Sequence, residues 1–192
     1  MTVIHTFSSA TIQQLRQKNI VLAIGVFDGV HIGHRVLIEQ TKQLGLKVSA
    51  ECAVYTFWPY PHHVYDPKFK PLIYPLSRKY KILKNLGVQH IIEQNFDSTF
   101  SKLHSEEFIQ YLLNQVPLLR GICVGSDFRF GYAREDGVDA LSTLCLKYGI
   151  YCKVIDKFAK DGIVVSSTHI RRLIAANDFK NAETLLGEKF SG

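Results

Sequence analysis

The chain has 192 residues, of which 46% are hydrophobic and 21% are charged, the proportions of one globular domain. A domain of this length buries roughly 70% of the surface that its unfolded chain exposes, so it needs no disulfide or structural metal to fold. The formal net charge of +6 is spread along the whole sequence rather than gathered in a basic run between aromatic residues. A positive charge suits anionic ligands, but this even spread is typical of a solvated surface and neither supports nor excludes a phosphate-rich substrate. The lack of a basic stripe argues against a nucleic-acid-binding surface.

The cysteine pattern and the absence of apolar runs of membrane-spanning length indicate a cellular compartment. Four cysteines are scattered without a C-x-x-C pair, at Cys52, Cys123, Cys145 and Cys152. We therefore expect neither a metal site nor a disulfide framework, as is usual in a reducing cytoplasm. The first residues lack a basic stretch followed by an apolar run, and no apolar run reaches the ~18 residues of a membrane span. We expect a cytoplasmic protein that makes no contact with a membrane.

Apolar runs of strand length alternate with helical segments along the chain. The expected strands are 19–25, 47–57, 88–92, 120–125 and 150–156. The expected helices are 33–44, 76–86, one that begins at Ser105 with that serine as its cap, 137–148, and two short ones after residue 168. Glycines at 45, 87 and 149 are expected to end three of these helices. The alternation predicts an α/β fold with a parallel sheet covered on both faces, and ligands bound beyond the carboxyl ends of its strands.

The first segment whose residues suit binding or catalysis is GVFDGVHIGH. It runs from Gly25 to His34 and begins at the end of the first expected strand. His31 and His34 are three residues apart at the start of a helix, so they lie on nearly the same side of it. That helix end carries roughly +0.5 of a charge and free N–H groups, which attract phosphate. Gly33 removes a side chain that would obstruct a nucleotide, and Gly29 lets the turn bend. An isolated H-x-x-H is most often incidental, but this position favours a nucleotide site.

The second segment, SSTHIR, precedes the closing helices. Ser166, Ser167 and Thr168 are ordinary helix caps by residue type. The same hydroxyls, with Arg171 or Arg172 one turn later, would also cradle a triphosphate tail. Both interpretations stay open at this point.

Two further loops follow expected strands and carry aromatic side chains. One contains Asp127, Phe128 and Arg129, and the other contains Phe57 and Pro59. Each combination fits either core packing or the binding of a flat heterocycle that bears a phosphate.

Taken together, G-x-F-D-G-x-H-x-G-H, T-F-x-P-x-P, G-x-D-F-R-F-G and S-S-T-x-I-R resemble the adenylyltransferase module of prokaryotic FAD synthetases. The resemblance extends from Ile20 to Gly187, and four motifs in the right order are specific where no single one is. This family belongs to the nucleotidylyltransferase superfamily, which implies a Rossmann-like sheet. Class I aminoacyl-tRNA synthetases share H-x-G-H, but the short chain and the S-S-T-x-I-R motif argue against them.

The resemblance implies that AMP is transferred from ATP to FMN in the presence of Mg²⁺, which gives FAD and pyrophosphate. By their place in the motifs, His31 and His34 would contact the reacting phosphates, while Ser167, Thr168 and Arg171 would hold the departing β and γ groups. The rest of the ATP pocket would comprise Gly25, Phe27, Asp28, Gly29, Gly33 and Ser166. The FMN side would comprise Phe57, Pro59, Asp127, Phe128 and Arg129. No metal-ligating side chain is predicted.

The sequence departs from the family pattern at three places. Tyr60 stands where the family more often has histidine, His169 where arginine is common, and Asp136-Gly137 where a Gly-Asp pair is usual. These departures bear on the flavin pocket more than on the ATP site. They also favour one alternative, a non-catalytic protein that binds flavin or nucleotide. A second alternative is adenylylation of another phosphorylated acceptor, against which only the resemblance of T-F-x-P and D-F-R-F-G argues.

In the family, the adenylyltransferase module usually precedes a riboflavin kinase domain. We expect residues 1–187 to form the FMN adenylyltransferase domain, with 188–192 as a tail where the kinase would begin. Riboflavin phosphorylation is accordingly expected to be absent from this polypeptide. The chain would then have a functional link to a separate riboflavin kinase.

Overall fold

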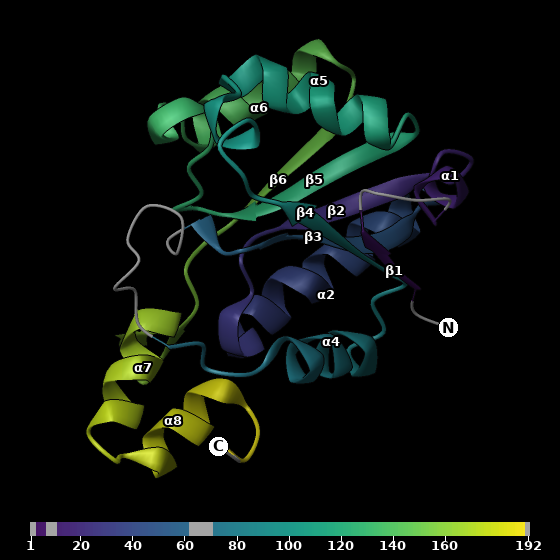
Figure 1. Ribbon diagram of the computed structural model, residues 1–192. Helices are drawn as coiled ribbons and strands as arrows, with labels where there is room; N and C mark the ends of the chain where they lie inside the picture. Colours follow the sequence, from purple (N-terminus) through teal and green to yellow (C-terminus); the bar gives the residue numbers. More distant parts are fainter. Residues whose placement is uncertain (1–2, 7–10, 62–70, 191–192) are drawn as a thin grey trace.

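The computed structural model describes residues 3–6, 11–61 and 71–190. At its centre lies a six-stranded sheet whose neighbouring strands all run parallel, in the order β1-β4-β3-β2-β5-β6 (Figure 1). The strands are β1 (Val3–Thr6), β2 (Ile20–Ile24), β3 (Glu51–Trp58), β4 (His90–Asn95), β5 (Leu119–Gly125) and β6 (Tyr151–Ile155). The predicted parallel sheet is confirmed, and β1 adds an edge strand that the sequence analysis did not predict.

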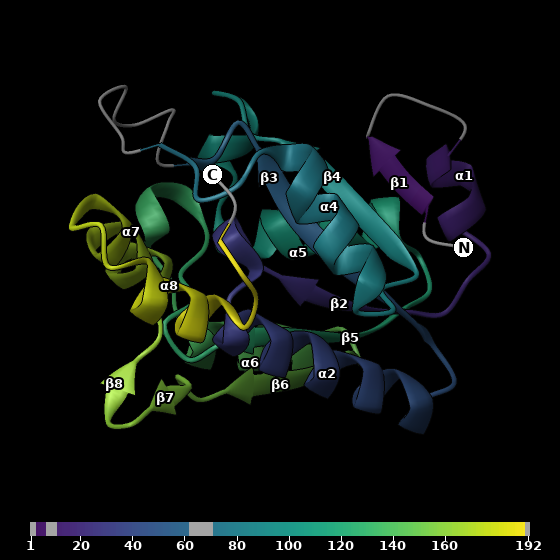
Figure 2. The same ribbon diagram turned by 90° about the horizontal axis from the view of Figure 1, so that it is seen from below.

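Helices cover both faces of the sheet, as the alternation predicted (Figure 1 and Figure 2). One face carries α5 (Ser105–Gln115) and α6 (Val138–Lys147). The other carries α2 (Ile32–Lys47) and α4 (Leu76–Asn85), with the closing helices α7 (Ser167–Ala175) and α8 (Phe179–Leu186) on the same side. The remaining elements are short: α1 (Thr11–Leu15), η1 (Asp28–Val30), η2 (Phe100–Lys102), η3 (Tyr132–Arg134), and the hairpin of β7 (Ala159–Lys160) and β8 (Ile163–Val164).

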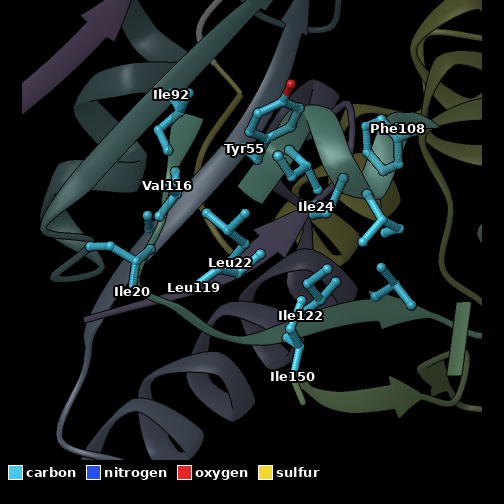
Figure 3. Close-up of a cluster of buried hydrophobic side chains, with 14 of the residues drawn as sticks. Ile20, Leu22, Ile24, Tyr55, Ile92, Phe108, Val116, Leu119, Ile122 and Ile150 are labelled. Atoms are coloured by element: carbon cyan, nitrogen blue, oxygen red, sulfur yellow. The ribbon is translucent and has the colours of Figure 1, made fainter. Parts of the chain in front are cut away.

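Both faces of β2 are buried, which explains its continuous apolar run. Ile20, Leu22 and Ile24 point into the cluster beneath α5 and α6, drawn in Figure 3. The alternate residues Val21 and Ala23 belong to the cluster beneath α2 and α4. Each fully buried aliphatic side chain of this kind contributes about 1.5–3 kcal/mol to stability.

The strand order reverses direction at β2. From β2 the chain moves outward through β3 and β4 on one side, and it then crosses to β5 and β6 on the other. In open parallel sheets a ligand binds beyond the carboxyl ends of the strands at such a switch point. The topology therefore directs attention to the loops that follow β2 and β5.

The end of α2 shows that one predicted helix stop is wrong. The helix continues past Gly45 to Lys47, so the strand expected from residue 47 begins only at Glu51. Gly45 is needed for close packing instead, because a Cβ there would lie 2.7 Å from the backbone oxygen of Ala50. The backbone N–H of Ala50 donates to the Gly45 carbonyl at 2.9 Å, which turns the chain back toward the sheet.

The predicted cap of α5 is also wrong by one residue. His104 is the N-cap, and its backbone N–H donates to the Glu107 carboxylate at 2.8 Å, while Ser105 is the first helical residue. The other two glycine stops are confirmed, since Gly87 and Gly149 adopt the left-handed φ values of 78° and 68° just beyond their helices.

The segment after α8 packs against the helices on its side of the sheet. The Glu188 carboxylate accepts hydrogen bonds from Arg35 of α2 at 2.8 Å and from Arg78 of α4 at 3.0 Å. The Phe190 ring stacks on that of Tyr74 with 5.9 Å between their centroids. Within the ranges described, every helix is too short or too polar to cross a membrane.

Candidate active site

A cavity of about 720 Å³ opens at the carboxyl ends of β2 and β5. Its position is the one that the switch in strand order predicts. Ten of the residues predicted to bind ATP or FMN line it: Gly25, His31, Gly33, His34, Phe57, Asp127, Phe128, Arg129, Ser166 and Ser167. Six others are described in the structure but do not line it: Phe27, Asp28, Gly29, Pro59, Thr168 and Arg171. The structure thus brings together residues from all four motifs.

The two histidines form one stacked unit at the start of α2. His31 is the N-cap, and its Nδ1 accepts a hydrogen bond from the backbone N–H of His34 at 3.3 Å. Their rings lie 3.6 Å apart and nearly parallel, which confirms that the spacing places them on one side of the helix. Glycine at position 33 permits this stack, since a Cβ there would lie 3.2 Å from the His31 Nδ1.

Burial keeps both imidazoles uncharged. It lowers the pKa of His31 to about 4, and burial together with the neighbouring His31 lowers the pKa of His34 well below its usual 6.5. A neutral imidazole retains one N–H donor. With the free N–H groups of the helix terminus, the pair can donate hydrogen bonds to phosphate oxygens without an added charge.

The turn that leads into α2 is strained. Phe27 and Val30 take left-handed φ values of 54° and 41°, and Gly29 takes 77°. Such conformations in residues other than glycine cost about 1–3 kcal/mol each and are common at functional sites. With this backbone conformation the Phe27 ring packs against His34, with 5.1 Å between the ring centroids.

Asp28 and Arg171 pair with each other behind the cavity wall. The buried Asp28 carboxylate contacts the Arg171 guanidinium and accepts the backbone N–H of Ile73 at 3.2 Å. Burial raises the pKa of Asp28, and the positive charge of Arg171 opposes that rise. Arg171 also donates from Nε to the Pro71 carbonyl at 3.2 Å, and Ser167 Oγ donates to the Asp28 carbonyl at 2.9 Å. These contacts fasten α7 to the strained turn.

The start of α7 follows the predicted capping pattern. The Ser166 side chain caps the helix by accepting the backbone N–H of His169 at 3.2 Å. Thr168 is exposed, whereas Ile170 is fully buried in the apolar stripe of the helix. Ser166 and Ser167 therefore line the cavity from a helix end that these hydrogen bonds hold in place.

Phenylalanines form another part of the cavity wall. Phe57 contacts Phe96 and Phe100 at centroid distances of 5.8 and 6.1 Å, and Phe128 stacks on Phe130 at 5.6 Å. The family resemblance implies that Phe57 and Phe128 lie on the flavin side, but no feature of the sequence points to Phe96 or Phe100. Neither belongs to a motif, and only the folded chain brings both to the end of β3.

Charged side chains from the loops after β5 and β6 complete the wall. The carboxylate of Asp127 pairs with Lys157 at 3.2 Å. Arg129 donates from Nη2 to the backbone carbonyls of Arg134 and Glu135 at 2.9 and 3.0 Å, so it fixes the loop that contains η3. Arg134 and Lys157 also line the cavity, and the sequence offered no signal for either.

The switch-point cavity and the histidine pair at a helix terminus define a Rossmann-like protein of the nucleotide-binding α/β class. A family model described as FAD synthetase matches residues 13–169. The chain belongs to the FAD synthetase family, which confirms the resemblance found in the four motifs.

Two relatives illustrate the extent of the similarity. The chain is 33% identical over 181 residues to the bifunctional riboflavin kinase/FMN adenylyltransferase of Escherichia coli (strain K12), covering 94% of this chain and 58% of the relative. It is 35% identical over 172 residues to the FAD synthetase of Listeria monocytogenes, covering 87% of this chain and 68% of the relative. The chain thus spans little more than half the length of the first relative.

Solved structures with low sequence identity share the fold. A macrolide-efflux protein from Streptococcus pneumoniae superimposes with a TM-score of 0.85 at 23% identity, covering 98% of this chain and 61% of that one. A pantoate-beta-alanine ligase from Francisella tularensis superimposes with a TM-score of 0.61 at 14% identity, covering 97% and 78%. At these identities the likeness supports the α/β architecture alone.

Proposed function

We propose that this chain transfers AMP from ATP to FMN and so produces FAD and pyrophosphate. The observation that carries the proposal is one cavity with two kinds of wall. One wall is formed by the histidine pair and two helix ends, and the other by a group of phenylalanines. The first wall suits phosphates and the second suits a flat ring system. The volume of about 720 Å³ lies in the usual range for small-molecule sites. The names of the relatives support FMN as the acceptor.

The reaction makes modest demands on the protein. A phosphate oxygen of FMN attacks the α-phosphorus of ATP, a new P–O bond forms, and the bond to the β-phosphate breaks to release pyrophosphate. The nucleophile is already anionic, so no general base is required. Catalysis depends on positioning and on stabilising the charge of the phosphates. His31 and His34 would serve this purpose as neutral donors, with the N–H groups that begin α2.

The departing β and γ phosphates are assigned to the start of α7. Ser166 and Ser167 line the cavity, and Thr168 follows at the same helix end. Because Arg171 pairs with Asp28, its contribution would be to hold this helix end against the turn after β2.

Mg²⁺ is proposed to enter as part of the ATP substrate. Across the described ranges, no group of three histidine, cysteine or acidic side chains is arranged to hold a metal. Mg²⁺ commonly needs only one or two carboxylates, the remaining ligands being phosphates and water. Asp127 and Asp156 offer carboxylates at the cavity. Their chemistry fits an ion carried by the triphosphate.

FMN would be supplied by a riboflavin kinase. This link is supported by the bifunctional relatives, whose names pair the two activities. We place the adenylyltransferase in residues 1–187 and its reaction in the cytoplasm, in keeping with the scattered cysteines.

The test is to incubate the purified chain with FMN, ATP and Mg²⁺ and to separate the flavins by chromatography. Formation of FAD with an equal amount of pyrophosphate, abolished by a chelator, is the expected result. Binding of both substrates without FAD would indicate a non-catalytic relative. Pyrophosphate release only with another acceptor, such as phosphopantetheine or nicotinate mononucleotide, would indicate the alternative adenylyltransferase.

A further inference from the structure

Lys79 of α4 is a buried cation beside the candidate active site. Its side chain is only 1% exposed. Burying an ammonium group is costly unless its donors are satisfied and its charge is used. Lys79 belongs to none of the four motifs, and the proposed reaction assigns it no role.

The Lys79 ammonium joins two of the motif loops through a closed network. Its Nζ donates to the Val26 carbonyl at 2.8 Å and to Thr56 Oγ1 at 2.7 Å, and Tyr60 Oη lies at 3.5 Å. Thr56 Oγ1 in turn donates to the Val26 carbonyl at 3.0 Å. Val26 lies in the turn before the histidines and lines the cavity. The Lys79 ammonium therefore lies behind the cavity wall, on the far side of the Val26 carbonyl.

The groups around Lys79 leave its charge incompletely compensated. The carboxylates that act on it are Asp28 of η1, which is already paired with Arg171, and Glu93 of β4. Burial outweighs both and lowers the pKa of Lys79 to about 7. The positive charge also acts on His34 and helps to lower the pKa of that imidazole. An anion bound at the start of α2 would favour the protonated form of Lys79 and would gain from its charge.

We propose that Lys79 is a positioning residue for the phosphate end of the cavity: it fixes the Val26 carbonyl and places a positive charge behind the histidine pair. Any effect of Lys79 on FAD formation rests on the proposed function. The effect on nucleotide binding does not, because any phosphate-bearing nucleotide would respond to the same charge.

A purely structural role for Lys79 predicts the opposite change in stability. If Lys79 mainly held the fold together, a neutral substitute would destabilise it. The Val26 carbonyl keeps its hydrogen bond from Thr56 when the ammonium is removed, and methionine fills a similar volume without a charge to desolvate. Among the described residues no carboxylate forms a salt bridge with Lys79, so its removal leaves no contacting ion-pair partner behind and relieves the cost of burying the ammonium group. The proposal therefore expects K79M to be at least as stable as the wild type and impaired in function.

The experiment compares K79M, K79R and the control K81M, which changes an exposed lysine of the same helix. Thermal unfolding gives stability, and calorimetric titration with ATP in buffers of different ionisation enthalpy gives affinity and proton uptake. We expect the wild type to take up a proton when it binds ATP near pH 8, and K79M to take up none. K79M should also keep its melting temperature and bind ATP at least 10-fold more weakly. K79R should retain more of the affinity than K79M, and K81M should match the wild type.

Two results would overturn the proposal. One is wild-type ATP affinity and proton uptake in K79M. The other is a lowered melting temperature with equal losses of ATP and FMN binding, which would mark Lys79 as a structural residue. If the wild type forms no FAD, the proposed function fails, but the ATP titrations still decide the role of Lys79.

Discussion

The buried pair of Asp28 and Arg171 allows a quantitative test of how the active-site turn is held. The side chains are 2% and 11% exposed, so the substitution R171Q would leave the Asp28 carboxylate buried without its direct ion-pair partner. Breaking a buried ion pair from one side costs about 3–5 kcal/mol. For a domain of this size each kcal/mol lowers the melting temperature by about 2–4 °C. We therefore expect R171Q to melt roughly 6–20 °C below the wild type.

The stability lost in R171Q should depend on pH in a defined direction. Burial raises the pKa of Asp28 above its ordinary 3.8, and Arg171 opposes the rise, so the variant pKa is higher still. A carboxyl with a raised pKa binds its proton more tightly in the native state than in the unfolded chain. The unfolding free energy of R171Q then falls as the pH rises through that pKa. Its deficit relative to wild type is largest at neutral pH and shrinks as the pH approaches 4.

Urea unfolding at several pH values measures these effects. The control is R172Q, which removes an exposed arginine from the next position of α7. The double variant D28N/R171Q should recover part of the lost stability, because it removes the stranded charge. At a temperature where R171Q is folded, ATP binding should weaken more than FMN binding, since α7 supplies Ser166 and Ser167 to the cavity. A loss below 1 kcal/mol at neutral pH, or no recovery in the double variant, would refute the reasoning.

Three further predictions concern single residues. H34A should keep the fold and slow FAD formation by about 10²–10³-fold, the usual effect of losing one charge-stabilising donor; near-normal turnover would remove His34 from the mechanism. The pKa of Lys79 is lowered from 10.5 to about 7 in the native state. Between these two pH values the Lys79 amine is therefore protonated in the unfolded chain and mostly deprotonated in the native protein. The unfolding free energy should rise with pH in that interval by up to ~1.4 kcal/mol per pH unit, and the slope should vanish in K79M. G29A should destabilise the protein by about 2–4 kcal/mol in urea, because position 29 has a φ of 77° and a Cβ would lie 2.9 Å from the Ile73 side chain. Wild-type stability in G29A would show that the turn can relax.

The sequence predicted those parts of the fold that local patterns determine. Buried parallel strands read as apolar runs, and two histidines three residues apart at a helix start had to share a side. Contacts between distant segments left no local signal. Asp28 and Arg171 are separated by 143 residues, and the ring contact of Phe57 with Phe96 exists only after β3 and β4 have paired. Gly45 shows a related limit, because its role in close packing looks in the sequence like a helix stop.

The three departures from the family pattern lie outside the cavity wall. Tyr60 is 1% exposed and packs under Lys79, with 4.9 Å from Nζ to the ring centroid, rather than in the cavity wall. Asp136 pairs with Phe130 through backbone groups in both directions, at 3.1 and 3.2 Å. His169 serves the Ser166 cap through its backbone N–H. The described side chains that line the cavity include none of the three. None of these three departures therefore changes a side chain that lines the cavity.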